Sequence, residues 1–496
     1  YQLSRELPVE LFFDVRLAND FRQWGRYYRS YEKEGVLVVE FTKKTNSRED
    51  SSDEKAEFSV FVAVMHDGFV SNSSGDWVRR SYSLNAKRNS ASERYVYKAA
   101  TIEAKNFVIS TASSAAAAIK ETVSAFKSID RLKKDGKKHY DSLCSYKSGS
   151  ETAMAANSAA IALDKLETAQ GLYAGLPWFF QEWTRDELIS SIALPAAARK
   201  RIVLKYLDKI LEDGRLPAIV SGSYEGSPST AADGIGWLFK RASEFIEKKA
   251  FRASEITKVK AALKKSIDAL LKNNFRNGFI FNGSEETWMD TEFNDDGRKG
   301  ACIEIQAMQL NMYNLMCKLS KTATYKKLEQ SLLQNVRRFF WNSGILADRL
   351  NDFTVRPNIF IAAYVYPQLL SRKEWEICFD TALQRLWLPW GGLATIDKSH
   401  PNFRSSYTGE TNESYHRGDS WFWINNIAAI VMVKINKRKF KSYIEKIAAA
   451  SANDILWKGA VGCGSELSSA SSQKAEGCLN QAWSNATFIE LIANCR

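Results

Sequence analysis

The chain of 496 residues has few of the side chains that bind metal ions or build disulfide frameworks. It contains only four histidines, and its seven cysteines are an odd number without a CxxC pair. Because no HxxxH spacing or Cys/His cluster occurs, we predict no zinc site, no other metal site and no cofactor. Unpaired cysteines in this number are typical of a reducing compartment. The composition therefore predicts a cytoplasmic protein.

Several other common signatures are missing. No apolar run reaches about 18 residues, so we expect no membrane span and no membrane partner. There is no GxxxxGKS, GxxxxGKT or GxGxxG motif for a phosphate loop, and no GxSxG motif for a nucleophile elbow. The chain begins at Tyr1 rather than at Met. Whether a further segment, such as a cleaved signal peptide, precedes this sequence therefore stays open.

The net charge of +12 permits contacts with nucleic acid. However, the basic residues are scattered through predicted helices, and no RNA- or DNA-binding motif accompanies them. We interpret the basic runs at 131–138 and 434–441 as solvated helix faces. A nucleic-acid binder would bind with steep salt dependence, but we expect no nucleic-acid partner.

Aromatic residues are abundant, with 14 Trp, 27 Phe and 19 Tyr, which favours a large enzyme or ligand-binding protein. β-Branched and aromatic runs near the N-terminus predict strands, and polar segments between them predict turns at 45–55 and 67–76. The predicted strands are 36–41, 58–64, 94–97 and 101–110. Short strands separated by turns predict an antiparallel β-sandwich domain over residues 1–111.

The composition changes at Ala112, where Ala, Lys and Glu become frequent at helical spacing. Residues 112–150 are predicted to hold a linker helix, mainly at 113–138. Residues 151–496 are predicted to form a mainly α domain of helical hairpins in a layer or ring. The predicted helices are 152–170, 186–211, 230–247, 253–273, 300–319, 323–340, 355–369, 372–385, 414–435, 437–450 and 479–493.

The stretch 175–188 combines four aromatic rings, three carboxylates and one Arg between two apolar helices. Rings that stack on sugar faces, beside charged groups that bind hydroxyls, predict a carbohydrate site, and a buried aromatic cluster with a capping Asp is the alternative. Structureless loops of great length in a compact domain are usually functional. Such loops are predicted at 214–229, 275–299, 386–413 and 454–478.

Two loop carboxylates have surroundings that suit acid and base chemistry. Asp290 follows Trp288 and Met289, where partial desolvation would raise its pKa, as a general acid requires. A helix-capping role is the alternative for Asp290. Glu466 follows a Gly-rich turn and precedes a helix start with Gln and Trp. Carboxylates that act on a neutral, hydroxylated substrate describe glycoside hydrolysis.

Eight short motifs resemble, in order, the C-terminal amylo-α-1,6-glucosidase region of glycogen debranching enzymes. They are Trp-Thr-Arg-Asp186, Glu-Thr-Trp-Met-Asp290, Cys-Ile-Glu304-Ile, Val-Arg-Pro-Asn358, Gly-Leu-Ala-Thr395, Tyr-His-Arg-Gly-Asp-Ser-Trp421, Ser-Glu466-Leu and Gln-Ala-Trp-Ser484. The resemblance covers about residues 150–496. It implies an (α/α)6 toroid like that of glucoamylase, preceded by a β-sandwich domain as in archaeal and prokaryotic members.

The resemblance also implies roles for individual residues. Asp290 is expected to be the general acid and Glu466 the general base. Arg185 and Asp186 are expected to hold the terminal glucose of an α-glucan such as glycogen or a limit dextrin. The other residues expected to bind substrate are Trp183, Trp288, Glu304, Arg356, Tyr415, His416 and Trp421.

The chain departs from the family pattern at two positions. Thr184 stands where the family usually has Gly, and Arg417 stands where it usually has Gln, a charge that could alter contacts to the glucan. The predicted reaction is inverting release of glucose from α-1,6 branch points, with the two carboxyl groups roughly 6.5–9.5 Å apart. A related inverting α-glucosidase (glucoamylase or trehalase-like) and a non-catalytic glucan-binding protein are the alternatives. Linkage preference and oligomeric state stay open.

Overall fold

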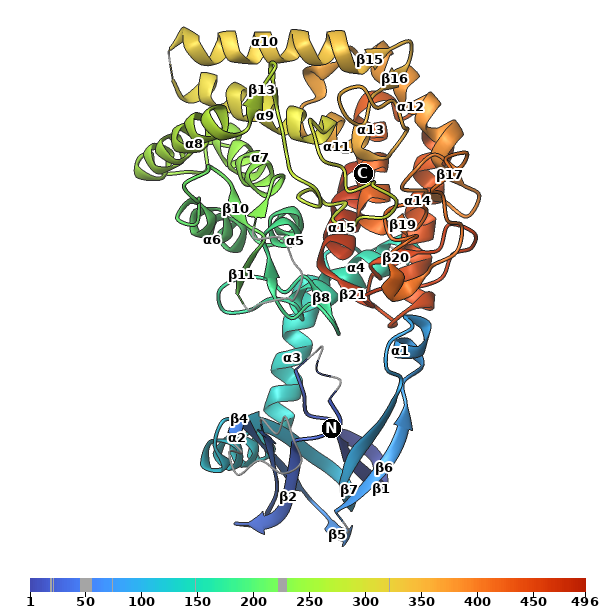
Figure 1. The fold of residues 1–496 in the computed structure, drawn as a ribbon. Helices are drawn as coiled ribbons and strands as arrows, with labels where there is room; N and C mark the ends of the chain where they lie inside the picture. The colour runs from blue at the N-terminus through green and yellow to red at the C-terminus, as the bar shows by residue number, and fades with distance from the viewer. Residues whose placement is uncertain are drawn as a thin grey trace. The chain divides into compact units, whose positions relative to one another are not determined.

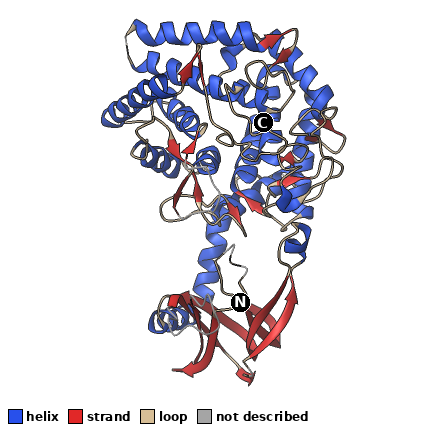
Figure 2. Cartoon of the chain, in the orientation of Figure 1, coloured by secondary structure: helices blue, strands red, loops and turns tan. Residues whose placement is uncertain are grey.

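The computed structural model describes residues 1–17, 20, 22–44, 56–73, 75–147, 149–221, 230–320 and 322–496. The chain divides into two compact units, Tyr1–Ser142 and Leu143–Arg496 (Figure 1). The first unit is built around strands and the second is mainly helical (Figure 2). The turn predicted at 45–55, and residues 222–229 of the loop predicted at 214–229, lie outside the described residues.

The first unit is organised around one long strand that pairs on both sides. Its strands are β1 (Gln2–Phe13), β2 (Arg26–Lys33), β3 (Val36–Lys44), β4 (Ala56–His66), β5 (Phe69–Asn72), β6 (Asp76–Ser81) and β7 (Glu93–Ala112), and a short helix, α1 (Ser83–Lys87), precedes β7. Strand β7 pairs antiparallel with β1, β5 and β6 and, near its end, with β4, which continues to β3 and β2. Apolar residues from both groups of strands, such as Ile102 and Val39, share one buried core. The predicted antiparallel β domain is confirmed.

Two features of this unit differ from the sequence-based prediction. Residues 69–72, inside a segment predicted as a turn, form strand β5 and pair with β7. The single helix predicted at 113–138 is two helices, α2 (Ala115–Lys127) and α3 (Ile129–Leu143). Ala118 and Ile119 of α2 are buried against the sheet, whereas α3 buries none of its residues. Helix α2 therefore belongs to the core of the first unit.

The second unit is a double ring of helices. The inner ring consists of α5 (Thr184–Ser190), α7 (Gly234–Glu247), α9 (Ile303–Leu319), α11 (Asn358–Val365), α13 (Phe422–Asn436) and α15 (Ala482–Cys495), each in contact with the next, and α15 closes onto α5. The outer ring consists of α4 (Glu151–Asp164), α6 (Ala196–Leu207), α8 (Ala253–Asn273), α10 (Ala323–Phe340), α12 (Arg372–Leu386) and α14 (Lys441–Asn453). Every residue of α5 and α11 is buried, whereas α10 buries only one face. This is the predicted (α/α)6 toroid.

The long loops all emerge at one end of the toroid. Helices alternate between the rings along the chain, so every segment from an outer helix to the next inner helix arrives at the same end. Within the described residues, these segments are 165–183, 208–221 with 230–233, 274–302, 341–357, 387–421 and 454–481. They contain short paired strands: β8 (Gly175–Leu176) with β21 (Asn480–Gln481), β9 (Glu182–Trp183) with β11 (Ile219–Ser221), β10 (Leu216–Pro217) with β12 (Thr230–Ala231), β13 (Phe275–Arg276) with β14 (Phe279–Ile280), β15 (Trp341–Asn342) with β16 (Ile345–Leu346), β17 (Trp387–Leu388) with β18 (Gly392–Leu393), and β19 (Ser420–Trp421) with β20 (Leu467–Ser468).

The helix predicted at 186–211 is divided between the two rings. Residues 191–193 form a short 3-10 turn, Leu194 is extended, and α6 begins after Pro195. The cause is local, because proline lacks an N–H and disfavours a helical conformation in the residue before it. The split places α5 in the inner ring and α6 in the outer ring. The helix predicted at 414–435 begins only at Phe422.

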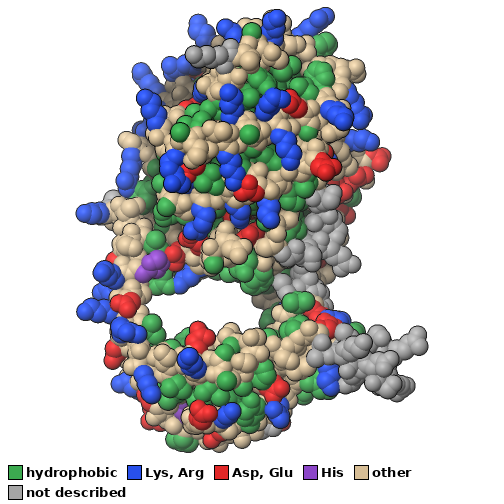
Figure 3. Space-filling model, turned by 90° about the vertical axis from the view of Figure 1, so that its left-hand side faces the viewer, with side chains coloured by type: hydrophobic (Ala, Val, Ile, Leu, Met, Phe, Trp, Pro, Cys, Tyr) green, Lys and Arg blue, Asp and Glu red, His purple; other side chains and the backbone are tan. Residues whose placement is uncertain are grey.

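The surface carries its basic residues in a dispersed pattern. On the face drawn in Figure 3, Lys and Arg side chains are spread over the helical unit, with Asp and Glu among them. Within the described part of the chain, no helix has both the length and the apolar character needed to cross a membrane.

Candidate active site

The predicted catalytic residues come from separate loops that enter the inner ring. Arg185 and Asp186 lie in the first turn of α5, Asp290 lies in the loop before α9, and Glu466 lies in the loop before α15. The charges of Asp290 and Glu466 both act on Asp186. We call Asp186, Asp290 and Glu466 the carboxyl triad. The fold therefore brings together residues that are far apart in the sequence.

Asp290 is held from two sides. Arg185 donates a hydrogen bond from Nη1 to Oδ2 at 3.1 Å, and His416 Nε2 lies 3.3 Å from Oδ1. Arg185 is itself fixed by Asp233, whose two oxygens accept from Nε at 2.9 and 2.7 Å. The Asp290 side chain is 24% exposed, whereas that of Arg185 is 6% exposed. The carboxyl group of Asp290 is therefore the accessible end of a buried chain of ion pairs.

The pKa of Asp290 differs in direction from the sequence-based expectation. Burial opposes the charged form, but the His416 hydrogen bond and the Arg185 charge outweigh it and hold the pKa of Asp290 below its ordinary value. Burial in turn lowers the pKa of His416 to about 4, so its imidazole is neutral near pH 7. Because Asp290 is then ionised, the proton between them resides on Nε2 of His416. In the unliganded protein Asp290 is a carboxylate.

Glu466 is fixed by donors on both of its oxygens. The Tyr415 hydroxyl donates a short hydrogen bond to Oε1, and the backbone N–H of Cys478 donates to Oε2 at 2.8 Å. Gly477 has φ +67°, and a Cβ added there would lie 2.1 Å from Glu466 Oε2, so only glycine fits. Burial, followed by the charge of Glu466, raises the pKa of Tyr415, which keeps its hydroxyl protonated. Donors to both oxygens stabilise a carboxylate.

Asp186 is the member of the carboxyl triad that keeps its proton. It is buried, and Gln481 Nε2 donates to Oδ1 at 3.0 Å. Burial raises the pKa of Asp186 to about 8, against the opposing charge of Arg185 and with the support of Asp290 and Glu466. Near pH 7 this side chain is therefore neutral and can both donate and accept hydrogen bonds.

Two of the tryptophans predicted to bind substrate, Trp288 and Trp421, pack against His416. His416 stacks on Trp421 at 5.1 Å between ring centroids and meets Trp288 edge-on at 5.3 Å. Trp421 Nε1 donates to the Tyr415 carbonyl at 2.7 Å. Both tryptophans are at most 2% exposed, so they orient His416 and Tyr415. Trp183 is partly exposed and precedes Arg185 at the start of α5.

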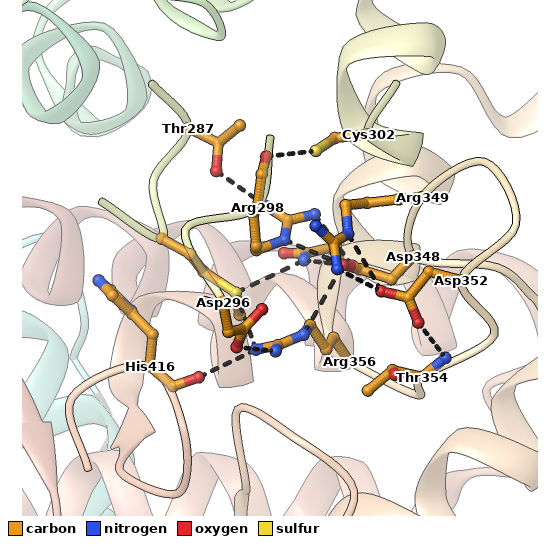
Figure 4. Close-up of polar contacts among 12 residues, drawn as sticks. Thr287, Asp296, Arg298, Cys302, Asp348, Arg349, Asp352, Thr354, Arg356 and His416 are labelled. Carbon is orange, nitrogen blue, oxygen red and sulfur yellow. Dashed lines mark hydrogen bonds and ion pairs between the residues drawn. The ribbon is translucent and has the colours of Figure 1, made fainter. Parts of the chain in front are cut away.

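Arg356 belongs to a buried ion-pair network with Arg298 and Asp348 (Figure 4), and Glu304 joins the same network through Arg298. Arg298 donates to Glu304 at 2.6 and 3.0 Å and to Asp348 at 2.9 Å. Arg356 binds Asp296 and donates to the His416 carbonyl at 3.1 Å. Glu304 is 0% exposed and Arg356 is 3% exposed. Their predicted contact with substrate stays a prediction, and their position favours support of the loops instead.

Sequence reasoning missed some partners of the site. Asp233, the N-cap residue of α7, binds Arg185, but it lay inside the helix predicted at 230–247 and gave no local signal of a site. Gln481 belongs to the Gln-Ala-Trp-Ser484 motif, but its hydrogen-bond partner, Asp186, is 295 positions away in the sequence. Among the described residues, no group of three or more His, Cys, Asp or Glu side chains is arranged to hold a metal ion.

The chain resembles known proteins in sequence and in fold. A family model described as amylo-alpha-1,6-glucosidase matches residues 149–490, and no curated protein matches the chain. A bacterial glucoamylase in complex with acarbose is 12% identical, with a TM-score of 0.62, over 95% of this chain and 75% of its own. A GH63 mannosylglycerate hydrolase from Thermus thermophilus is 12% identical, with a TM-score of 0.51, over 67% of this chain and 98% of its own.

Both solved structures share the fold at low identity, and the family match spans more than half of the chain. The chain therefore belongs to the amylo-alpha-1,6-glucosidase family and is a glycoside hydrolase of the glucoamylase-like fold.

Proposed function

We propose that this protein is an inverting glucosidase that releases glucose from α-1,6 branch points of glycogen-type limit dextrins. The observation that carries the proposal is the different environment of two carboxylates. Asp290 is held by two ionisable side chains, Arg185 and His416, whereas the donors to Glu466 are the Tyr415 hydroxyl and the backbone N–H of Cys478. Two carboxylates with different surroundings are the elements of glycoside hydrolysis. The family match supports the choice of linkage.

In this mechanism Glu466 is the general base. Its oxygens are held by the Tyr415 hydroxyl and the Cys478 N–H, so the carboxylate has a defined direction. It accepts a proton from a water molecule that attacks the anomeric carbon on the face opposite the leaving group. Attack on that face inverts the configuration, which requires roughly 6.5–9.5 Å between the two carboxyl groups.

Asp290 is the general acid, and it must carry a proton when it acts. Its pKa is low in the unliganded protein because His416 and Arg185 stabilise its charge. Sugar hydroxyls that accept hydrogen bonds from Arg185, together with the exclusion of water, would weaken that stabilisation and raise the pKa of Asp290. The substrate thereby promotes protonation of the acid that cleaves it. Asp290 then gives its proton to the glycosidic oxygen.

Asp186 and Arg185 hold the terminal glucose in this proposal. A neutral Asp186 donates and accepts hydrogen bonds to hydroxyl groups at no cost for desolvating a charge. Arg185 supplies donors in a fixed orientation because Asp233 binds its Nε. The partly exposed ring of Trp183 is the candidate for stacking on a sugar face.

The test is glucose release from a glucosyl-branched limit dextrin and from linear maltooligosaccharides in parallel, with the anomer followed by NMR. Rapid β-glucose from the branched substrate alone supports the proposal. Rapid release from the linear chains identifies a glucoamylase instead. Initial release of α-glucose contradicts inversion. Glucan binding without release from either substrate identifies a binding protein.

Two variants test the assignment of the carboxylates. Asp290→Asn and Glu466→Gln should each lower kcat about 10²- to 10⁴-fold, the usual worth of general acid or base catalysis. Circular dichroism and glucan affinity should stay near those of the wild type. Near-normal turnover in Asp290→Asn would show that another residue is the acid.

A further inference from the structure

Arg417, where the chain departs from the family pattern, binds both ends of the segment that follows Asp290. We call residues 291–296 the acid loop. Arg417 Nη2 donates to the carbonyls of Thr291 at 2.7 Å and Asp296 at 2.5 Å. Nε donates to the Asp296 carboxylate at 3.2 Å, and Nη1 donates to the Thr291 hydroxyl at 3.2 Å. The side chain is 1% exposed, so its guanidinium is occupied by protein rather than directed at a glucan.

The acid loop requires anchors of this kind. It contains neither helix nor strand. Asn294 and Asp295 have φ of +50° and +57°, a left-handed conformation that Asn and Asp adopt more readily than other non-glycine residues but that remains uncommon. Such conformations persist only where surrounding contacts determine them. Four hydrogen bonds from one buried side chain provide these contacts and close the loop into a fixed shape.

The same turn that carries Arg417 also contacts Asp290. His416, the preceding residue, lies 3.3 Å from Asp290 Oδ1, and its carbonyl accepts from Arg356. Arg356 also binds the Asp296 carboxylate, which Arg417 shares. Residues 416 and 417 therefore hold Asp290 by its carboxyl group and the acid loop by its backbone.

We propose that Arg417 is a positioning residue that fixes the general acid Asp290 by clamping the acid loop against the turn that bears His416. The inference rests on the proposed function, because it concerns the acid step of that reaction. The planar guanidinium can reach both carbonyls and the Asp296 carboxylate at once. The Gln usual in the family has no charge and fewer donors. With Gln, Asp296 would lose one of the two cationic partners that the described residues provide and keep Arg356.

The test separates acid catalysis from the rest of the reaction. Arg417→Gln and Arg417→Lys are compared with wild type on the branched dextrin and on α-glucosyl fluoride. Hydrolysis of the fluoride breaks a C–F bond and forms a C–O bond to water, and fluoride leaves without prior protonation. It needs Glu466 but hardly depends on Asp290. Arg337→Gln is the control for loss of an ion pair away from the site. The Arg337 side chain, which is 40% exposed, also binds a carboxylate, Glu374, and a backbone carbonyl, that of Leu369.

We expect Arg417→Gln to lower kcat on the dextrin about 10- to 100-fold, as for a displaced catalytic group, with KM nearly unchanged. Its turnover of α-glucosyl fluoride should fall less than about threefold. Arg417→Lys should lie between wild type and Arg417→Gln on the dextrin. Arg337→Gln should lower thermal stability without separating the two substrates. Asp290→Asn should show the same selective loss as Arg417→Gln, but larger.

Two outcomes would overturn the inference while leaving the proposed function in place: equal losses on both substrates, or no loss on the dextrin. If Arg417→Gln does not fold, Arg417→Lys alone decides between selective and equal loss. A wild-type protein that hydrolyses neither substrate would overturn the proposed function itself. Backbone hydrogen exchange at residues 291–296 would then still reveal whether Arg417 holds the acid loop.

Discussion

Arg185 links the partly exposed carboxylate of Asp290 to the buried carboxylate of Asp233. Its Nη1 lies 3.1 Å from Asp290 Oδ2, while its Nε lies 2.7 Å from Asp233 Oδ2. Asp233 is 1% exposed. A single guanidinium therefore serves both the proposed chemistry and the electrostatic balance of the toroid core.

Removing Arg185 should destabilise the fold as well as stop catalysis. Arg185→Met leaves Asp233 charged and buried without its cation, which typically costs about 3–5 kcal/mol of unfolding free energy. In Arg185→Met/Asp233→Asn the loss should be much smaller than the sum of the two single losses. Urea denaturation of all four proteins measures this coupling. Additive losses would contradict a direct ion pair.

A methyl group at Gly477 should disable the base. Gly477→Ala places a Cβ against Glu466 Oε2, so the carboxylate must move from its position between Tyr415 and Cys478. We expect at least about a 100-fold loss in kcat, since small displacements of catalytic groups have effects of this size.

The matched control for Gly477 lies in the first unit. Gly35 has φ +71°, close to the +67° of Gly477, but nothing lies within 4 Å of an added Cβ. Gly35→Ala should cost about 1 kcal/mol of stability from backbone strain alone and leave glucose release unchanged. Equal activity in the two variants would mean that contact with Glu466 is not the cause.

Loss of the Tyr415 hydroxyl should slow the reaction without weakening glucan binding greatly. Tyr415→Phe removes the donor to Glu466 Oε1 and keeps the ring against Trp421. We expect kcat to fall about 10- to 100-fold, because a misdirected catalytic group loses this much. Steady-state kinetics would check this. A large rise in KM with unchanged kcat would assign Tyr415 to substrate binding alone.

Asp186 should give the protein a characteristic dependence of stability on pH. Its pKa rises from 3.8 to about 8 on folding, mainly through burial, so between these values the native state holds a proton that the unfolded state lacks. This group's contribution therefore favours folding below about pH 4 and declines as pH rises to about 8. Each pKa unit corresponds to about 1.4 kcal/mol.

Asp186→Asn cannot titrate, so it isolates this contribution. The melting temperature of the variant relative to wild type should increase from about pH 4 to about pH 8 and then level off. Differential scanning calorimetry across this range would measure the trend. Parallel curves for the two proteins would show that Asp186 does not titrate as its burial implies.

The architecture could largely be predicted from local patterns. Strand and helix periodicity reports on the face that each element buries, which is why a β domain followed by packed helical hairpins was expected. The closed toroid was expected from the resemblance of the loop motifs. The main error, one helix at 186–211, arose because apolar spacing continues across Pro195. A proline inside a periodic run was the signal for two helices in different rings.

The sequence by itself determined the change of fold class near Ala112, the succession of helices and the chemical types in the loops, since each depends on residues near one another in the chain. Only the tertiary structure decided how these groups behave. The pKa of Asp290 is lowered rather than raised because His416, 126 positions away, and Arg185 contact it. The clamp of Arg417 on the acid loop depends in the same way on distant partners. Electrostatic environment follows from spatial neighbours, and adjacent residues such as Trp288 and Met289 do not reveal it.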